Sequence, residues 1–437
     1  MSKRVTFIHA SDLHLGAPFR GLRALSSKWA NRLLSAIPES YDRMVDAAIA
    51  RDVDFVVVSG DIFDSARPSY GDYLHFFEGL ERLGEAGIPV YLITGNHDPY
   101  TSWQHDFFSL PPNATMLPGD RPGFALVERD GQPLCLIGGR GYYNQTWPMD
   151  ECIAEGVTRE AAEQALAVQH PHAAEAPFAV GLLHTGLNLD PVKAPVDPAV
   201  LMRAGMDYWA LGHIHDRREV CREPLAAYPG CTQGLHINEP GEKGCLLVTA
   251  EARPDGGYAV RTSFRPLGPA VWKTLDMDLG GAASLDDWKT GSEPDWIARL
   301  PRSGPAAKCC LCGCGWQGRT ELDGLLRKGT TCAELADRLR EDGSGVPRIW
   351  IKDIDVATRP CVERGALLER EDLLGEVFRL SEAARTASGL QALREGPLAP
   401  LFAHARAGKA LEPLTDEELA RLLDDAESLC LDLLEND

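Results

Sequence analysis

The feature that most constrains the fold is the alternation, over residues 1–270, of short apolar runs with segments of helical periodicity. In residues 41–49 and 73–83, apolar side chains recur at about 3.6-residue intervals, which indicates helices. Apolar runs separated in this way indicate the buried strands of an α/β layered sheet, in which sites lie at the carboxyl ends of strands. The predicted strands are Val5–His9, Phe55–Ser59, Val90–Thr94, Leu134–Gly138, Ala179–His184 and Tyr208–Leu211.

The 437 residues are enough for about three domains. We predict an α/β domain over residues 1–270, a small α+β domain over 271–360 and a helical segment over 361–437. The longest apolar runs fall far short of the roughly 18 to 20 residues that a bilayer span needs, so no membrane-embedded segment is expected.

Residues 361–437 carry two helical patterns. An apolar stripe indicates the first helix, and a capping box formed by Thr415 and Glu418 begins the second. The first stripe consists of Leu373, Val377, Leu380 and Ala384, and the second of Leu419, Leu422, Leu423, Ala426, Cys430 and Leu433.

Acidic residues exceed basic residues throughout the chain. The 44 Lys and Arg against 64 Asp and Glu give a formal net charge of −20, and the deficit is the same before and after residue 270. This balance argues against a broad electrostatic grip on nucleic acid, although it leaves a metal-centred grip open. The 12 cysteines are too sparse for a disulfide scaffold and the N-terminus shows no export signal, so we expect a cytoplasmic protein with reduced thiols.

Polar motifs follow five of the predicted strands. A lone histidine at a strand end is usually structural, but five such ends converge on one edge of the sheet, where polar side chains without a shared purpose would cost desolvation energy. The motifs are Ser11-Asp12-Leu13-His14, Gly60-Asp61-Ile62-Phe63-Asp64, Gly95-Asn96-His97-Asp98, His184 and Gly212-His213-Ile214-His215.

Seven side chains of these motifs offer nitrogen or oxygen donors, and none offers a thiolate. Imidazole combined with carboxylate favours Mn, Fe or Zn over Ca. Seven donors are enough for two divalent ions if one carboxylate bridges, and two ions about 3.5–4 Å apart suit in-line displacement at phosphorus. The donors are Asp12, His14, Asp61, Asn96, His184, His213 and His215.

The order of the motifs, D-x-H, G-D-x-x-D, G-N-H-D, H and G-H-x-H, resembles that of the calcineurin-like metallophosphoesterases over roughly residues 4–250. Residues 7–16 and 60–69 are similar to the DNA-repair nuclease branch, of the SbcD and YhaO type, and residues 228–239 resemble the YhaO type most closely. The resemblance implies an α/β fold built as a four-layer metallophosphoesterase β-sandwich flanked by helices. A small α+β capping domain and a C-terminal helical segment would follow it.

The resemblance also implies a role for each site residue. His97 would protonate the leaving oxygen or steady the transition state, with Asp98 orienting it. Asp64 stands where archaeal and eukaryotic members usually carry His, and we expect it to support the site rather than to act in catalysis. Mn²⁺ is the expected ion, with Fe or Zn as alternatives. The two ligand sets would be Asp12, His14, Asp61 and His215 for one ion, and Asp61, Asn96, His184 and His213 for the other.

For the whole chain, the resemblance implies a nuclease that cleaves DNA phosphodiester bonds, as an exonuclease or an endonuclease. Its C-terminal helical segment would dock on the coiled coil of an SbcC-type or YhaN-type ATPase, and a homodimer is expected. An ATPase that supplies much of the DNA-binding charge would account for the net charge of −20.

Two other functions fit the same ligand set. One is a phosphodiesterase for small substrates such as cyclic nucleotides, and the other is a binding or regulatory subunit whose metal centre is structural. The long extension beyond residue 270 favours a macromolecular substrate or partner, and the presence of His97 favours catalysis.

Three further features have ordinary structural explanations. His9 lies within the first predicted strand, and we expect it in the core. Residues Cys309 to Cys314 lack the second cysteine pair of a zinc site, and alternate residues of a strand face one side, so a strand of small residues is predicted. His236 lies in the loop after the last motif and stays outside the predicted site.

Overall fold

The computed structural model describes residues 4–19, 27–104, 109–148, 150–254, 256–282, 284, 306–342, 348–361, 363–403 and 414–435. The chain divides into two compact units. Unit 1 comprises residues 1–275, 299–314 and 335–353, and unit 2 comprises 276–298, 315–334 and 354–437. The domain limits near residues 270 and 360 stay a prediction from the sequence.

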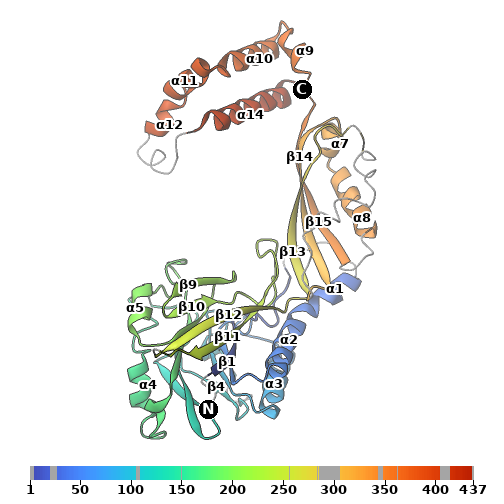
Figure 1. Cartoon of the computed structure of the whole chain (residues 1–437). Helices are drawn as coiled ribbons and strands as arrows, with labels where there is room; N and C mark the ends of the chain where they lie inside the picture. The colour runs from blue at the N-terminus through green and yellow to red at the C-terminus, as the bar shows by residue number, and fades with distance from the viewer. Residues whose placement is uncertain are drawn as a thin grey trace. The chain divides into compact units, whose positions relative to one another are not determined.

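Two six-stranded sheets form the centre of unit 1 (Figure 1). The first has the order β12-β11-β1-β2-β3-β4, with β1 to β4 parallel, and the second has the order β5-β6-β7-β8-β10-β9, with β6, β7, β8 and β10 parallel. The strands of the first sheet are β1 (Arg4–Ala10), β2 (Phe55–Ser59), β3 (Val90–Ile93), β4 (Ala114–Met116), β11 (Gly244–Ala252) and β12 (Tyr258–Pro266). Those of the second are β5 (Gly123–Arg129), β6 (Gln132–Arg140), β7 (Phe178–His184), β8 (Tyr208–Gly212), β9 (Arg218–Arg222) and β10 (Leu225–Tyr228).

Helices cover the outer face of each sheet. Tyr41 and Phe76, from two helices beside the first sheet, are buried in one cluster with Val56 of β2. Ala162 and Trp209 share a second cluster, which joins helix and strand on the other sheet. The helices are α1 (Ser27–Leu34), α2 (Ala36–Ala50), α3 (Tyr70–Glu85), α4 (Arg159–Leu166) and α5 (Pro198–Arg203), with short 3₁₀ turns at Tyr100–Ser102 and Ala173–Glu175.

Aromatic side chains fill the space between the two sheets. Phe7 of β1 stacks on Phe55 of β2 with 4.6 Å between ring centroids, and it forms a T-shaped pair with Tyr208 of β8 at a centroid distance of 5.4 Å. All three rings are fully buried in a cluster that contains residues of both sheets. The mixed α/β class and its layered sheets, predicted from the sequence, are confirmed. Because this core joins β1 and β2 to β8, it brings the carboxyl ends of strands from both sheets together.

A third sheet contains three long strands in the order β13-β14-β15. Each strand begins in unit 1 and continues in unit 2. The predicted strand of small residues is confirmed, since Cys309 begins β14 and the first six residues of that strand are buried. The elements of this region are β13 (Ala270–Asp278), β14 (Cys309–Thr320), α7 (Asp323–Leu326), α8 (Thr331–Asp342) and β15 (Arg348–Pro360).

Short helices and one longer helix complete unit 2. The predicted capping box is confirmed, because the Thr415 amide donates to the Glu418 carboxylate at 2.7 Å and the Glu418 amide donates to the Thr415 hydroxyl at 3.2 Å. No helix in the described residues is apolar over a length that would cross a membrane. The helices are α9 (Arg364–Leu368), α10 (Leu373–Ala384), α11 (Ala387–Glu395), α12 (Ala399–Ala403) and α14 (Asp416–Glu435).

The buried face of α10 differs from the predicted one. Leu374 and Phe378 pack with Leu431 of α14 in a small core. Leu373 and Leu380, which belong to the predicted stripe, are 66% and 62% exposed. The buried face is therefore shifted by one residue. Leu373 and Leu374 are adjacent, and the face that contains Leu374 also buries the larger Phe378 side chain.

Candidate metal centre

Loops at the carboxyl ends of β1, β2, β3, β7 and β8 gather all seven predicted donors. Two sets each offer three ligand atoms that lie within 4.8 Å of one another. The amide oxygen of Asn96 adds a further donor, 3.3 Å from the Nε2 atom of His184. The two sets are Asp12, His14 and His215, and Asp61, His184 and His213.

The carboxylate of Asp61 lies near histidines of both sets. Its Oδ2 atom is 3.3 Å from Nε2 of His184 and 3.9 Å from Nε2 of His14, and its Oδ1 atom accepts a hydrogen bond from the His97 amide at 2.9 Å. Burial alone would raise the pKa of Asp61, but the His184 imidazole, with smaller contributions from His14 and His97, holds it below its usual range. The Asp61 carboxylate therefore lies close to a histidine of each set.

Each histidine of the two sets is held by an oxygen atom at one ring nitrogen. Carboxylate and carbonyl oxygens only accept hydrogen bonds, so the nitrogen that faces each of them carries the proton. The other nitrogen of each ring is then left with a lone pair for a metal ion. The pairs are His14 Nδ1 with Asp64 Oδ1 (3.0 Å), His184 Nδ1 with the Ser59 carbonyl (2.8 Å), His213 Nε2 with Asp190 Oδ2 (3.1 Å) and His215 Nδ1 with Glu239 Oε1 (2.6 Å).

The rings of His14 and His215 face each other, with their Nε2 atoms 3.1 Å apart. Because both Nδ1 atoms donate to carboxylates, the two Nε2 lone pairs need a proton or a metal ion between them. Burial would lower the pKa of His215, but the Glu239 hydrogen bond and the charge of Asp12 raise it to about 9. Two imidazole nitrogens bound to one ion at about 2.0–2.1 Å would lie roughly 3 Å apart, so this pair fits a shared ion.

Four of the seven donors stand on strained backbone. Asp12, His14 and Asp61 have φ angles of 53°, 47° and 50°, and His213 has 103°. Side chains other than glycine rarely adopt this region, and residues held there cost about 1–3 kcal/mol each and concentrate at functional sites. Backbone hydrogen bonds keep two of them in place, from the Asp12 amide to the Gly60 carbonyl and from the His14 amide to the Asp61 carbonyl, both 3.1 Å long.

Glycines in the motifs allow the loops to approach closely. A Cβ atom at Gly60, whose φ is +89°, would lie 2.6 Å from the Nδ1 atom of His184. A Cβ atom at Gly95 would lie 2.0 Å from the Asp61 carboxylate. Any larger residue at either position would push apart two loops that carry predicted ligands.

The ring of His97 is oriented by Asp64 and not by Asp98. Its Nδ1 atom donates to the Asp64 carbonyl oxygen at 2.8 Å. The carboxylate of Asp98 instead accepts from the amides of Gly95, at 2.8 Å, and Ile62, at 3.1 Å. The prediction that Asp98 orients His97 is therefore wrong, since Asp98 braces the loops after β2 and β3. Burial, with the charge of Asp61, raises the pKa of Asp98 to about 8.

Asp64 has the supporting position that the sequence predicted for it. Its side chain holds the imidazole of His14, and its carbonyl holds that of His97. His9 is fully buried in β1, as predicted, where its Nδ1 atom lies 2.9 Å from the Tyr208 hydroxyl, and burial lowers its pKa to about 3.

Glu239 supports the centre and was missed by the sequence interpretation. Besides His215, its carboxylate meets the His236 ring at 3.2 Å and accepts from the Leu235 amide at 2.7 Å. Burial would raise its pKa, but the hydrogen bond with His215 lowers it to about 2, so the carboxylate is ionised. The signal available in the sequence was its position in the stretch, residues 228–239, that follows the last histidine motif.

Asp190 and Tyr142 were also missed, and no motif marks either of them. Asp190 holds the His213 ring from the loop after β7. The ring of Tyr142 packs edge-on against His184, with 5.7 Å between ring centroids. The Tyr142 hydroxyl is buried without a hydrogen-bond partner in the part of the chain that the structure describes. An unsatisfied buried hydroxyl is costly, which suits a position beside a centre that binds further groups.

Comparison with known proteins identifies the family of this centre. Residues 5–217 match the calcineurin-like phosphoesterase family. Residues 5–217 therefore form a calcineurin-like metallophosphoesterase domain. This superfamily uses two divalent metal ions, and the two donor sets, with Asp61 3.3 Å from His184 and 3.9 Å from His14, fit such a pair.

Relatives of this metallophosphoesterase include proteins of DNA repair. The chain is 36% identical over 285 residues to the uncharacterized metallophosphoesterase YhaO of Bacillus subtilis, covering 64% of this chain and 65% of that protein. It is 27% identical to the DNA double-strand break repair protein Mre11 of Thermoplasma acidophilum, over 53% of this chain and 57% of that protein. For Mre11 of Methanopyrus kandleri the identity is 25%, over 76% and 78%. These similarities support the predicted DNA-repair nuclease branch, although the chain spans less than two thirds of the first two relatives.

Removing the Glu239 carboxylate should weaken metal binding. Glu239→Ala would free the His215 ring to rotate, and loss of such a supporting hydrogen bond typically costs 10–100-fold in metal affinity. We expect a loss in this range for one of two Mn²⁺ sites by isothermal titration calorimetry. Glu242→Ala removes an exposed carboxylate from the same loop and should change nothing. Unchanged Mn²⁺ affinity in Glu239→Ala would show that Glu239 does not support the centre.

Proposed function

We propose that this metallophosphoesterase hydrolyses DNA phosphodiester bonds. Exonuclease activity is the main proposal, and endonuclease activity is the alternative. The observation that carries the proposal is the buried Asp61 carboxylate near histidines of both donor sets, with His97 beside it. Two divalent ions, when bound, would supply positive charge for phosphate oxygens and lower the pKa of a water molecule. We assign Asp12, His14, Asp61 and His215 to one ion, and Asp61, Asn96, His184 and His213 to the other. Mn²⁺ is the proposed ion, with Fe or Zn as alternatives.

We assign the proton transfer to His97. Its Nδ1 atom donates to the Asp64 carbonyl, which fixes the ring. Its Nε2 atom has no hydrogen bond to any described residue, and the ring is partly exposed beside the perpendicular ring of His14, 5.0 Å away. A protonated Nε2 can therefore give its proton to the leaving oxygen of a phosphodiester and recover one from solvent.

The relatives favour DNA over a small substrate. The Mre11 relatives are named DNA double-strand break repair proteins, and the similarity covers 53% and 76% of this chain. A net charge of −20 leaves little capacity for an electrostatic grip on a duplex by the chain alone. We therefore propose that an SbcC-type or YhaN-type ATPase supplies much of the DNA-binding charge. Cytoplasmic location and homodimerisation stay predictions from the sequence.

The surface for this ATPase lies on the helices of unit 2. Leu373 and Leu380 of α10 are exposed, as are Leu422, Leu429 and Leu433 of α14. Several exposed leucines on two helices that pack together suit a protein interaction surface. Glu427 stabilises the helices beneath, since its buried carboxylate receives hydrogen bonds from the guanidinium groups of two arginines.

Substitution of His97 tests the catalytic proposal. His97→Ala should keep its metal ions and lose about 10²- to 10⁴-fold in turnover, the usual contribution of a general acid. The assay uses Mn²⁺ with linear duplex DNA carrying overhangs, single strands and a chromogenic phosphodiester. His172→Ala, which removes an exposed histidine of unit 1, is the matched control. Hydrolysis at the wild-type rate by His97→Ala would remove His97 from the mechanism.

The three substrates separate the proposal from its alternatives. DNA degradation that depends on His97 supports the nuclease. Hydrolysis of the chromogenic diester alone, also after addition of the ATPase, would favour the small-substrate phosphodiesterase. Metal binding without hydrolysis of any substrate would favour a binding or regulatory subunit.

Removal of the C-terminal helices tests the partner proposal. A chain ending near residue 365 lacks α10 to α14, so it should lose ATPase binding and keep hydrolysis of the chromogenic diester. In the full chain, Leu429→Glu combined with Leu433→Glu should weaken binding at least tenfold by biolayer interferometry. Val168→Glu alters a 90% exposed residue of unit 1 and serves as the control. Full ATPase binding by the shortened chain would contradict this assignment.

A further inference from the structure

We propose that a pocket beside the metal centre binds one unpaired nucleotide of the substrate strand, next to the phosphodiester that is cut. The inference rests on the proposed nuclease function and specifies its substrate. Four features support it, namely the position of the pocket, the hydrogen bonds that fix its walls, the chemistry of its lining residues and a pair of stacked tyrosines.

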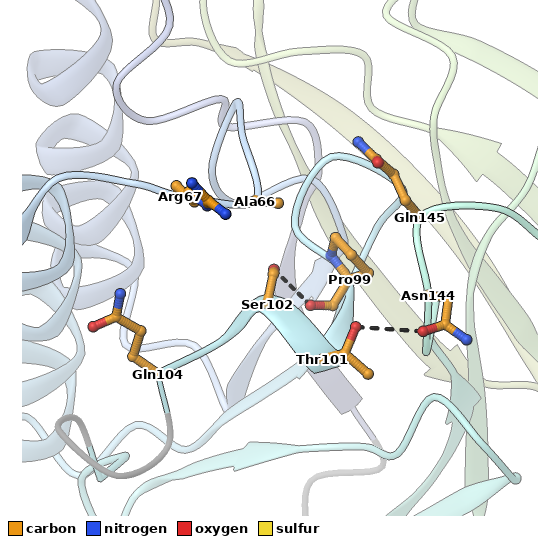
Figure 2. Close-up of a pocket in the computed structure, with 8 residues that line it drawn as sticks. All are labelled: Ala66, Arg67, Pro99, Thr101, Ser102, Gln104, Asn144 and Gln145. Carbon is orange, nitrogen blue, oxygen red and sulfur yellow. Dashed lines mark hydrogen bonds between the residues drawn. The ribbon is translucent and has the colours of Figure 1, made fainter.

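The pocket is large enough for a nucleotide. Its volume is about 590 Å³, within the range of about 300–1,000 Å³ that small-molecule sites occupy. Figure 2 shows three segments around it, the turn after β2, the 3₁₀ turn after β3 and the loop after β6. The lining residues are Ala66, Arg67, Pro99, Thr101, Ser102, Gln104, Asn144 and Gln145.

The pocket adjoins the proposed general acid. The hydrogen bond from His97 Nδ1 to the Asp64 carbonyl joins two of its segments a few residues before each reaches the pocket. Pro99 follows His97 by two residues, so their Cα atoms are at most about 8 Å apart, given 3.8 Å for each peptide step. A nucleotide in the pocket would therefore lie beside the phosphate that His97 serves.

Hydrogen bonds fix the walls before any ligand binds. The Tyr142 carbonyl accepts from the Thr94 hydroxyl at 2.7 Å and from the Tyr100 amide at 2.8 Å. The Tyr143 carbonyl accepts from the Thr101 amide at 3.1 Å. Because these bonds join the second and third segments, little conformational entropy is lost when a ligand enters.

The lining suits a base and one phosphate. Gln104, Asn144 and Gln145 carry amides that both donate and accept, as the edges of bases require. Arg67 is the one charged residue among the eight described lining residues, and its exposed guanidinium can bind a phosphate through two parallel hydrogen bonds. A single cation suits one phosphate, whereas a grip on duplex backbone needs many.

Two tyrosines on the same segments form a stacked pair. The rings of Tyr100 and Tyr143 are 6.0 Å apart with 15° between their planes, and Tyr143 is 42% exposed. Exposed aromatic rings near a phosphate site are typical of proteins that bind single strands, because a base can extend the stack. A paired base has both faces covered by its neighbours, so this contact selects an unpaired one.

Binding of labelled oligonucleotides tests the proposal. The full chain, kept in EDTA to prevent cleavage, is titrated against a fluorescein-labelled oligothymidylate and against a blunt-ended duplex of two separate strands. Tyr143→Ala should weaken single-strand binding about 5- to 150-fold, the range for loss of one stacked base. Tyr143→Phe should restore it, because the ring remains. Arg67→Ala should also weaken it, while Arg51→Ala, an exposed arginine elsewhere in unit 1, should have no effect.

Two results would overturn the nucleotide pocket. One is unchanged single-strand affinity in both Tyr143→Ala and Arg67→Ala, and the other is an equal loss of affinity for the blunt-ended duplex. DNA cleavage is measured separately with Mn²⁺, so the two proposals can fail independently. Cleavage without any effect of Tyr143→Ala or Arg67→Ala on single-strand binding overturns the pocket alone. Tyr143-dependent binding without cleavage, also after addition of the ATPase, overturns the nuclease proposal alone.

Discussion

The rest of this centre depends on the contacts that stabilise the buried carboxylate of Asp61. A charged group that is only 1% exposed is stable only if positive or donating groups surround it. Here these groups are His14 and His184, which come from opposite sheets, and the backbone amide of His97. The two sheets must therefore hold their strand ends within a few ångströms of one another, and the aromatic core around Phe7 fixes the sheets in that relation.

Oxygen atoms outside the predicted ligands orient the histidine rings of the centre. Each histidine of the two donor sets is held through one nitrogen by a group outside the predicted ligands, so its other nitrogen turns inward. The stretch of residues 228–239, which resembles the YhaO type, contains one of these acceptors. It presses Glu239 against His215, and Lys243 just beyond it donates to the His215 carbonyl at 3.1 Å.

Much of the fold could be predicted because its signals are local. The strand Phe55–Ser59 is an uninterrupted apolar run with a motif directly after it, and β2 has the same limits. Glu239 could not be assigned, because its contact with His215 spans 24 residues and depends on how a loop folds back. Asp98 was given the wrong partner because adjacency to His97 does not show where a side chain points. On α10, the sequence alone could not decide whether Leu373 or Leu374 is buried. The packing of Leu374 against Leu431 of α14 decides it.

Anomalous diffraction from crystals grown with Mn²⁺ tests the central claim most directly. The account predicts two peaks about 3.5–4 Å apart on either side of the Asp61 carboxylate. One peak should lie among Asp12, His14 and His215, and the other among Asn96, His184 and His213. A single peak, or two peaks that do not share Asp61, would contradict the two-metal centre.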